Sequence, residues 1–182
     1  MIKTLIFNGS PRKNGHTRAL INELVENLEG EKVYIDAYYA DISPCNDCRY
    51  CWKNPGCIIE DEMQKIYDLV EKVDFVVIAS PLYFGELTGN LLNIFSRFQM
   101  FYARKYILKD KEFKLNKKKG AVLLTGGSAV ETGCAQKTAA FILKHINAEL
   151  IKTIVSFNTD KVPAVYDKKA LEEIRELAAN IS

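Results

Sequence analysis

Short apolar runs alternate along the chain with stretches in which apolar residues recur every three or four positions. Runs that are apolar and rich in β-branched or aromatic residues predict strands at 2–8, 32–38, 74–80, 120–125 and 149–157. The runs at 74–80 and 120–125 are apolar nearly throughout, which is typical of parallel strands covered on both faces. The pattern therefore favours a buried parallel sheet.

Helical periodicity follows each predicted strand. In the first helical stretch, for example, Leu20, Ile21 and Leu24 fall on one face. The predicted helices cover residues 17–28, 61–71, 90–104, 132–146 and 168–179. This alternation predicts an α/β fold with a five-stranded parallel sheet, helices on both faces and right-handed crossovers. No linker or repeat divides the chain, so we expect residues 1–182 to form one domain, with an irregular cysteine-rich loop at about 40–60.

Composition excludes several classes of protein. Hydrophobic residues make up 48% and charged residues 26%, as in ordinary globular domains, and the net charge of +2 gives no argument for a nucleic-acid partner. No apolar run approaches the roughly 20 residues that span a bilayer, so we expect no membrane segment. The first residues also lack the features of a signal peptide, and we therefore expect a cytoplasmic protein.

Candidate ligand-binding residues lie in three loops that leave the carboxyl ends of predicted strands, where open parallel sheets bind ligands. The loop after the first strand opens a helix, whose N-terminus attracts phosphate. His16 occupies the position where a P-loop requires lysine, and the dinucleotide fingerprint is absent. We therefore predict a monophosphate site formed by Ser10, Arg12, Asn14, Gly15, His16 and Thr17.

The other two loops suit a flat ring. The loop after the third strand carries two adjacent aromatic residues, which can stack on or border such a ring. We expect the ring to lie against Pro81, Leu82, Tyr83, Phe84 and Gly85. The loop after the fourth strand permits close backbone approach through its glycines, and its candidates are Gly126, Gly127 and Ser128.

Two of these loops carry a family resemblance. Gly9–Thr17 and Ser80–Gly85 resemble the phosphate loop and the isoalloxazine loop of the NADPH-dependent FMN reductases, a branch of the flavodoxin-like superfamily. His16 departs from the small polar residue usual at its position. The resemblance implies a three-layer flavodoxin-like sandwich with strand order 2-1-3-4-5, FMN as cofactor and NAD(P)H as a co-substrate.

Four of the five cysteines fall within a short segment, at Cys45, Cys48, Cys51 and Cys57. Bacterial ferredoxins use a similar tight spacing to hold a [4Fe–4S] cluster. The segment also resembles the compact motif of iron–sulfur flavoproteins, a subgroup of the same FMN fold. Two other interpretations stay open, namely thiols without a metal and a structural zinc site.

The predicted function is an FMN-dependent oxidoreductase that takes electrons from NAD(P)H or a reduced carrier. Hydride transfer to a flavin needs no protein nucleophile, so we assign no catalytic acid or base. Quinones and ferredoxin are the expected partners, and the alternative is a non-catalytic electron carrier that exchanges electrons with ferredoxin. The apolar residues around the whole circumference of 90–104 predict a homodimer.

Overall fold

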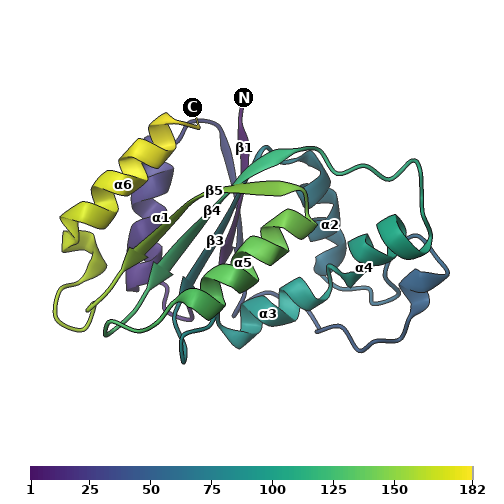
Figure 1. The fold of residues 1–182 in the computed structure, drawn as a ribbon, viewed down its shortest axis with the longest axis horizontal. Coiled ribbons are helices and arrows are strands. Elements are labelled where there is room, and N and C mark those ends of the chain that lie inside the picture. The colour runs from purple at the N-terminus through teal and green to yellow at the C-terminus, as the bar shows by residue number, and fades with distance from the viewer. Residues whose placement is uncertain (182) are drawn as a thin grey trace.

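The computed structural model describes residues 1–181, and it confirms the predicted five-stranded parallel sheet with strand order β2-β1-β3-β4-β5 (Figure 1). The strands are β1 (Lys3–Asn8), β2 (Glu31–Asp36), β3 (Phe75–Pro81), β4 (Lys118–Thr125) and β5 (Ala148–Ser156). The helices are α1 (His16–Asn27), α2 (Met63–Lys72), α3 (Gly89–Ser96), α4 (Gln99–Tyr102), α5 (Gly133–His145) and α6 (Lys168–Ala179). Among the described residues, no helix is long and apolar enough to cross a membrane.

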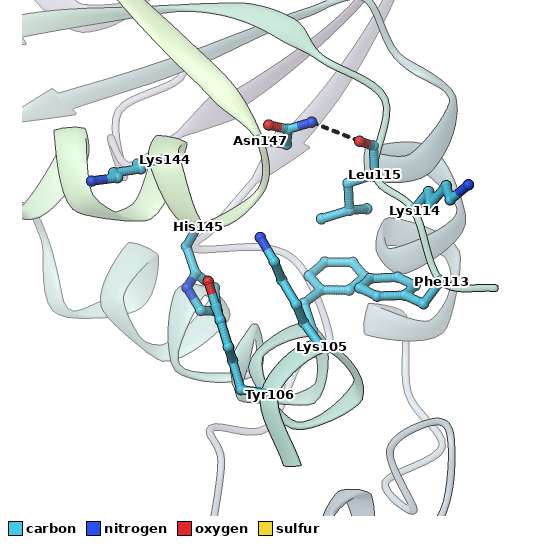
Figure 2. A pocket seen from close by; sticks show the side chains of 9 residues that line it. Lys105, Tyr106, Phe113, Lys114, Leu115, Lys144, His145 and Asn147 are labelled. Atoms are coloured by element: carbon cyan, nitrogen blue, oxygen red, sulfur yellow. Dashed lines mark hydrogen bonds between the residues drawn. The ribbon is translucent and has the colours of Figure 1, made fainter. Parts of the chain in front are cut away.

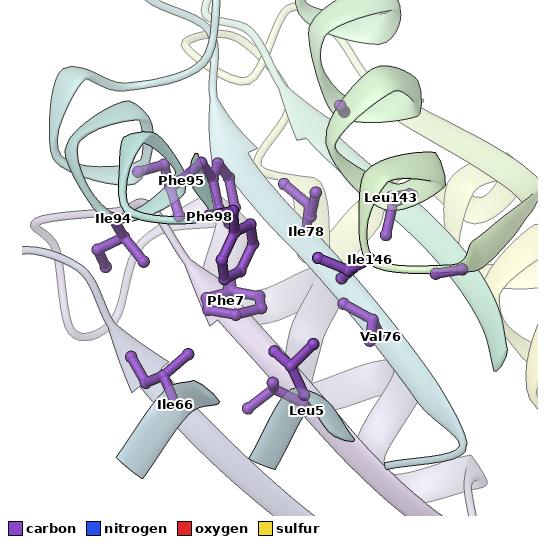
Figure 3. Close-up of a cluster of buried hydrophobic side chains, with 14 of the residues drawn as sticks. Leu5, Phe7, Ile66, Val76, Ile78, Ile94, Phe95, Phe98, Leu143 and Ile146 are labelled. Atoms are coloured by element: carbon purple, nitrogen blue, oxygen red, sulfur yellow. The ribbon is translucent and has the colours of Figure 1, made fainter. Parts of the chain in front are cut away.

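Two hydrophobic clusters on opposite faces of the sheet hold the three layers together. Successive side chains of a strand point to opposite faces, so Leu5 and Phe7 enter one cluster while Ile6 enters the other. The first cluster packs α2, α3, α4 and α5 on the sheet, and Phe7 meets the ring of Phe95 at a centroid distance of 5.2 Å (Figure 3). The second cluster packs α1 and α6 on the other face. Figure 1 shows this division of the helices between the two faces.

The prediction of one continuous helix over 90–104 is wrong. Helix α3 ends at Ser96, α4 begins at Gln99, and a π-helical turn follows at Ala103–Ile107. The helix is interrupted at Arg97, whose side chain points into the protein and is not exposed at all. Because the chain bends here, apolar residues from several sides of the predicted helix are buried within this chain, namely Leu91, Ile94, Phe95, Phe98, Met100 and Phe101. Their number therefore no longer argues for a partner surface.

Candidate flavin and cysteine sites

A cavity of about 150 Å³ lies at the carboxyl ends of the strands, where the three predicted loops meet. Of the predicted site residues, it is lined by Ser10, Arg12, Gly15, His16, Thr17, Pro81, Leu82, Tyr83 and Gly127. The remaining predicted residues are not part of this lining, namely Asn14, Phe84, Gly85, Gly126 and Ser128. The structure adds Pro11, Thr125, Thr159 and Asp160, which the sequence did not single out.

The N-terminus of α1 opens onto this cavity. Gly15 is the N-cap residue, and no side chain caps the first turn, so its N–H groups are free to meet an anion. Ser10 fixes the loop before the helix, because its hydroxyl oxygen accepts a hydrogen bond of 3.2 Å from the N–H of Arg12. A hydroxyl, an exposed guanidinium and a bare helix N-terminus therefore share one small cavity.

Buried and partly buried polar side chains support the loop before α1. Asp36, at the end of β2, accepts hydrogen bonds of 2.6 Å from both Asn8 and Arg18. Asn8 in turn accepts a bond of 3.1 Å from the N–H of Ser10 through its side-chain oxygen. This chain of contacts links β2, β1 and α1 to the loop, so the loop is shaped before any ligand arrives.

The far wall of the cavity comes from β4 and the loop after β5. The hydroxyl groups of Thr17 and Thr125 lie 2.8 Å apart and are buried. Thr159 donates to the carbonyl of Gly126 from its N–H and from its hydroxyl, at 3.1 and 3.2 Å. Asp160 approaches the backbone so closely that a Cβ at Gly127 would lie 2.4 Å from its carboxylate. The glycine is therefore needed for this close approach.

The loop after β3 forms a tight turn at the mouth of the cavity, closed by reciprocal hydrogen bonds between Tyr83 and Glu86. Phe84 has a φ of +55° and projects fully into solvent. Burial raises the pKa of Tyr38, and the neighbouring Tyr83 hydroxyl raises it further. Tyr38, which follows β2, is thus a further aromatic side chain beside the predicted flavin loop. The sequence reasoning did not include it.

The cysteine loop lies beyond the other end of α3, and Arg97 holds its base together. The guanidinium donates to the carbonyl of Ser43 at 2.8 Å and to that of Ile59 at 3.1 Å, so both ends of the loop converge on it. It also pairs with the carboxylate of Asp61 at 2.7 Å. Cys45 is tied to α3 as well, because its N–H donates to the hydroxyl of Ser96 at 2.9 Å.

The ion pair at the loop base is buried, since the side chain of Asp61 is only 8% exposed. Burial raises the pKa of Asp61, but hydrogen bonds from Arg97 and from the N–H groups of Ser43 and Met63 lower it, and the net effect is a lowered pKa. Asp61 therefore stays charged opposite Arg97 at neutral pH.

The thiol of Cys51 interacts electrostatically with the other three thiols of the loop. Burial raises the pKa of Cys51, and so do the thiols of Cys57, Cys45 and Cys48. Cys57 also lies beside the Tyr67 hydroxyl, within hydrogen-bonding reach. The backbone around Cys48 is strained, because Asp47 and Arg49 both adopt a positive φ, of 52° and 59°.

Within residues 1–181, no group of three or more histidine, cysteine or acidic side chains is placed to hold a metal ion. A single zinc ion bound by four thiolates would draw all four sulfurs to about 2.3 Å from one centre. In a [4Fe–4S] cluster each thiolate binds a different iron, so the four sulfurs lie farther apart. The described cysteines form neither arrangement, so this finding does not separate the two metal centres.

The sheet order and the cavity at its carboxyl edge define a flavodoxin-like protein. The family model for NADPH-dependent FMN reductase matches residues 2–162, so the chain belongs to that family and is an oxidoreductase.

Known proteins agree with this assignment. An iron–sulfur flavoprotein of Methanosarcina thermophila is 31% identical over 152 residues, which are 80% of this chain and 74% of that protein. An iron–sulfur flavoprotein of Archaeoglobus fulgidus is 26% identical over 176 residues, 93% of this chain and 85% of that protein. An NAD(P)H:quinone oxidoreductase structure from Methanothermobacter marburgensis shares the fold, with a TM-score of 0.77 at 15% identity over 100% of this chain and 99% of that one.

Proposed function

We propose that this protein binds FMN at the cavity described above and passes electrons from NAD(P)H or a reduced carrier to an acceptor such as a quinone. The observation that carries the proposal is the meeting of three loops around an uncapped helix N-terminus. When bound, the flavin supplies hydride acceptance and the release of electrons one or two at a time. The residues that line the cavity suit this cofactor.

The cavity matches a phosphate group and the start of its chain, because about 150 Å³ is too small for a whole flavin. We assign the phosphate to the N–H groups at the start of α1, the hydroxyl of Ser10 and the guanidinium of Arg12. The ring would then lie at the loop that carries Leu82 and Tyr83, which line the mouth of the same cavity. No side chain is assigned to proton transfer.

We propose in addition that Cys45, Cys48, Cys51 and Cys57 hold a [4Fe–4S] cluster. Three features of the loop support this assignment: the spacing of the four cysteines along the chain, the strained backbone on both sides of Cys48, and the closure of the loop by Arg97. Strain of this kind persists only where the surrounding structure enforces it, and it gathers at functional sites. The cluster would supply one-electron exchange, with ferredoxin as a partner.

Binding of flavin tests the first assignment. Arg12→Gln removes a charge-assisted hydrogen bond to phosphate, so we expect it to weaken FMN binding by about tenfold or more, measured by flavin fluorescence. Riboflavin, which lacks the phosphate, should bind the variant as it binds the wild type. Lys13→Gln is the matched control, because Lys13 lies over the ring of Tyr39 at 5.3 Å and does not line the cavity. Equal losses for FMN and riboflavin would contradict the assignment.

Anaerobic purification tests the second assignment. The visible spectrum and assays of flavin, iron, sulfide and zinc should show FMN with about four irons and four sulfides per chain. A flavin spectrum without stoichiometric iron would remove the cluster, and zinc in its place would revive the structural-metal interpretation.

Turnover separates an enzyme with small-molecule substrates from an electron carrier. We expect steady oxidation of NAD(P)H in the presence of a quinone. If that reaction is absent while electron exchange with reduced ferredoxin is fast, the protein acts as a carrier. Because both activities need the bound flavin, a difference between them reflects the electron partner and not loss of the cofactor.

We also propose that the protein is a homodimer that works in the reducing cytoplasm. Phe84 supports the first part, because a fully exposed phenylalanine beside the flavin loop is suited to contact with a second copy. The second part is supported by the five cysteines, all free in the structure, since cytoplasmic thiols are kept reduced. A monomeric mass by light scattering at micromolar concentration would refute the dimer.

A further inference from the structure

A second cavity, of about 310 Å³, lies far along the chain from the flavin loops, between the π-helical turn Ala103–Ile107, the segment that leads into β4 and the end of α5. Figure 2 shows that it has two aromatic walls. Phe113 forms one, stacked on Phe101 at a centroid distance of 5.7 Å, and Tyr106 and His145 form the other. The two cavities share no lining residue.

The charged side chains that line this cavity are all lysines, and the ammonium group of Lys105 lies over the ring of Tyr106, 5.2 Å from its centroid. Lys105 stands between the two walls, with its ammonium group directed toward Asn147, while Lys114 and Lys144 lie on either side (Figure 2). No acidic residue lines the cavity. Within residues 1–181, none of these three lysines forms a salt bridge.

His145 also lines the cavity. Burial lowers the pKa of its imidazole and the nearby charge of Lys105 lowers it further, while a hydrogen bond with the backbone of Phe98 acts in the opposite direction. The imidazole is therefore neutral at neutral pH, and the positive charge of the cavity comes from its lysines. An anion placed there would be attracted by Lys105, and no acidic residue in the lining opposes this attraction.

We propose that this cavity binds an anion carried on a flat ring, of the size and chemistry of a nucleoside monophosphate. The volume is at the lower end of small-molecule sites, which agrees with a single ring system and one charged group. Phe101 and Arg104 lie against the ring of Phe113, and Lys105 lies over that of Tyr106, so a bound ring would meet the edges of these aromatic side chains. Lys105 gives the anion its charge-assisted hydrogen bond. The π-helical turn that places Lys105 and Tyr106 is itself a rare element that is frequent at functional sites.

Calorimetric titration of the FMN-saturated protein at low salt tests the proposal with three probes: adenosine monophosphate, inorganic phosphate and adenosine. Saturation with FMN keeps the nucleotide out of the phosphate cavity at α1. We expect the nucleotide to bind about tenfold more tightly than either half alone, because only it uses both the walls and the charge. No heat of binding at millimolar nucleotide overturns the proposal. If adenosine binds as tightly as the nucleotide, the proposed role of the lysine charge is overturned. If phosphate binds as tightly as the nucleotide, the proposed role of the aromatic walls is overturned.

Variants locate the binding. Lys105→Gln should weaken binding of the nucleotide by about tenfold or more, whereas Tyr106→Leu should reduce nucleotide affinity toward that of phosphate and leave phosphate binding unchanged. Lys169→Gln is the matched control, because Lys169 is an exposed lysine on α6, in the opposite helix layer. This control variant should bind the nucleotide like the wild type. Wild-type affinity in Lys105→Gln overturns the site, wherever the nucleotide then binds.

Nuclear magnetic resonance of the unmodified protein provides a reading that needs no variant. The chain has two histidines, His16 and His145, and they lie in different cavities. Addition of the nucleotide to the FMN-saturated protein should shift the ring resonances of His145 and leave those of His16 unchanged. The reverse pattern would place the nucleotide in the flavin cavity and overturn the inference.

Discussion

Replacing Arg97 with methionine should destabilise the protein and loosen the cysteine loop. The guanidinium is wholly buried, pairs with Asp61 at 2.7 Å and holds the carbonyls of Ser43 and Ile59 at 2.8 and 3.1 Å. Methionine fills much of the same volume but offers no hydrogen-bond donor. The variant therefore leaves one buried carboxylate and two carbonyls without these partners.

The size of the loss follows from the burial of the pair. Removing one partner of a buried ion pair costs about 3–5 kcal/mol, because the remaining charge is left uncompensated. The N–H groups of Ser43 and Met63, which donate to Asp61 at 3.0 Å, keep part of its stabilisation. We therefore expect the free energy of unfolding to fall by about 3 kcal/mol or more.

Urea unfolding measures this loss, and two further variants show its origin. Arg175→Met is the control: Arg175 pairs with Glu23 at 2.6 Å, but its side chain is 58% exposed, so the change should be about 1 kcal/mol or less. In the double variant Arg97→Met with Asp61→Asn, removal of the unpaired charge should recover at least about 1 kcal/mol. Trypsin should also cut Arg97→Met faster than the wild type at Arg49 in the cysteine loop.

Two results would refute this reasoning. If Arg97→Met lowered stability by no more than the exposed control, the buried pair would not hold the loop. If the double variant were less stable than Arg97→Met alone, the cost would come from lost packing, and not from an unpaired carboxylate.

Three further predictions concern the sheet and the phosphate loop. Gly9→Ala should destabilise the protein by about 1–3 kcal/mol in urea unfolding, because its Cβ would lie 2.4 Å from buried Leu91; a neutral result would show that the helix can move away. Thr17→Val removes the buried contact of 2.8 Å with the Thr125 hydroxyl and should lose about 1–2 kcal/mol; unchanged thermal melting would contradict this. Burial lowers the pKa of Lys118 to about 8, so the folded state releases this proton at lower pH than the unfolded state. Stability should therefore rise from pH 8 toward about 10.5 relative to Lys118→Met, and a flat difference would exclude the lowered pKa.

The main elements of the fold could be predicted from sequence because their signals are local. A short, β-branched apolar run such as 74–80 is typical of a parallel strand covered on both faces, and the structure places β3 in the middle of the sheet. The loop residues of the flavin cavity were also accessible, because the carboxyl ends of neighbouring parallel strands must lie together. Ser10, Thr17 and Tyr83, far apart in the sequence, line one cavity for that reason.

The rest depends on contacts between distant segments, for which no local pattern exists. Arg97 lies in the middle of a stretch that is apolar nearly all round, and no local pattern shows that its partner is Asp61, 36 positions earlier. Asp160 enters the cavity from a loop without a recognised motif, and it lies there because the backbone approaches it at Gly127. A charged residue in the middle of an apolar helical pattern, such as Arg97, is the one signal that could have indicated the break.

The two ends of the cysteine loop are held together outside the segment that carries the cysteines. Ser43 and Ile59, which bind Arg97 through their carbonyls, lie outside residues 44–58, and so does Asp61, which neutralises the guanidinium. A segment of different length or chemistry could therefore replace 44–58 with this closure kept, provided that it fills the places of Cys51 and Cys57 against the hydrophobic core. No residue of 44–58 lines the cavity at the carboxyl ends of the strands, so that cavity would keep its lining.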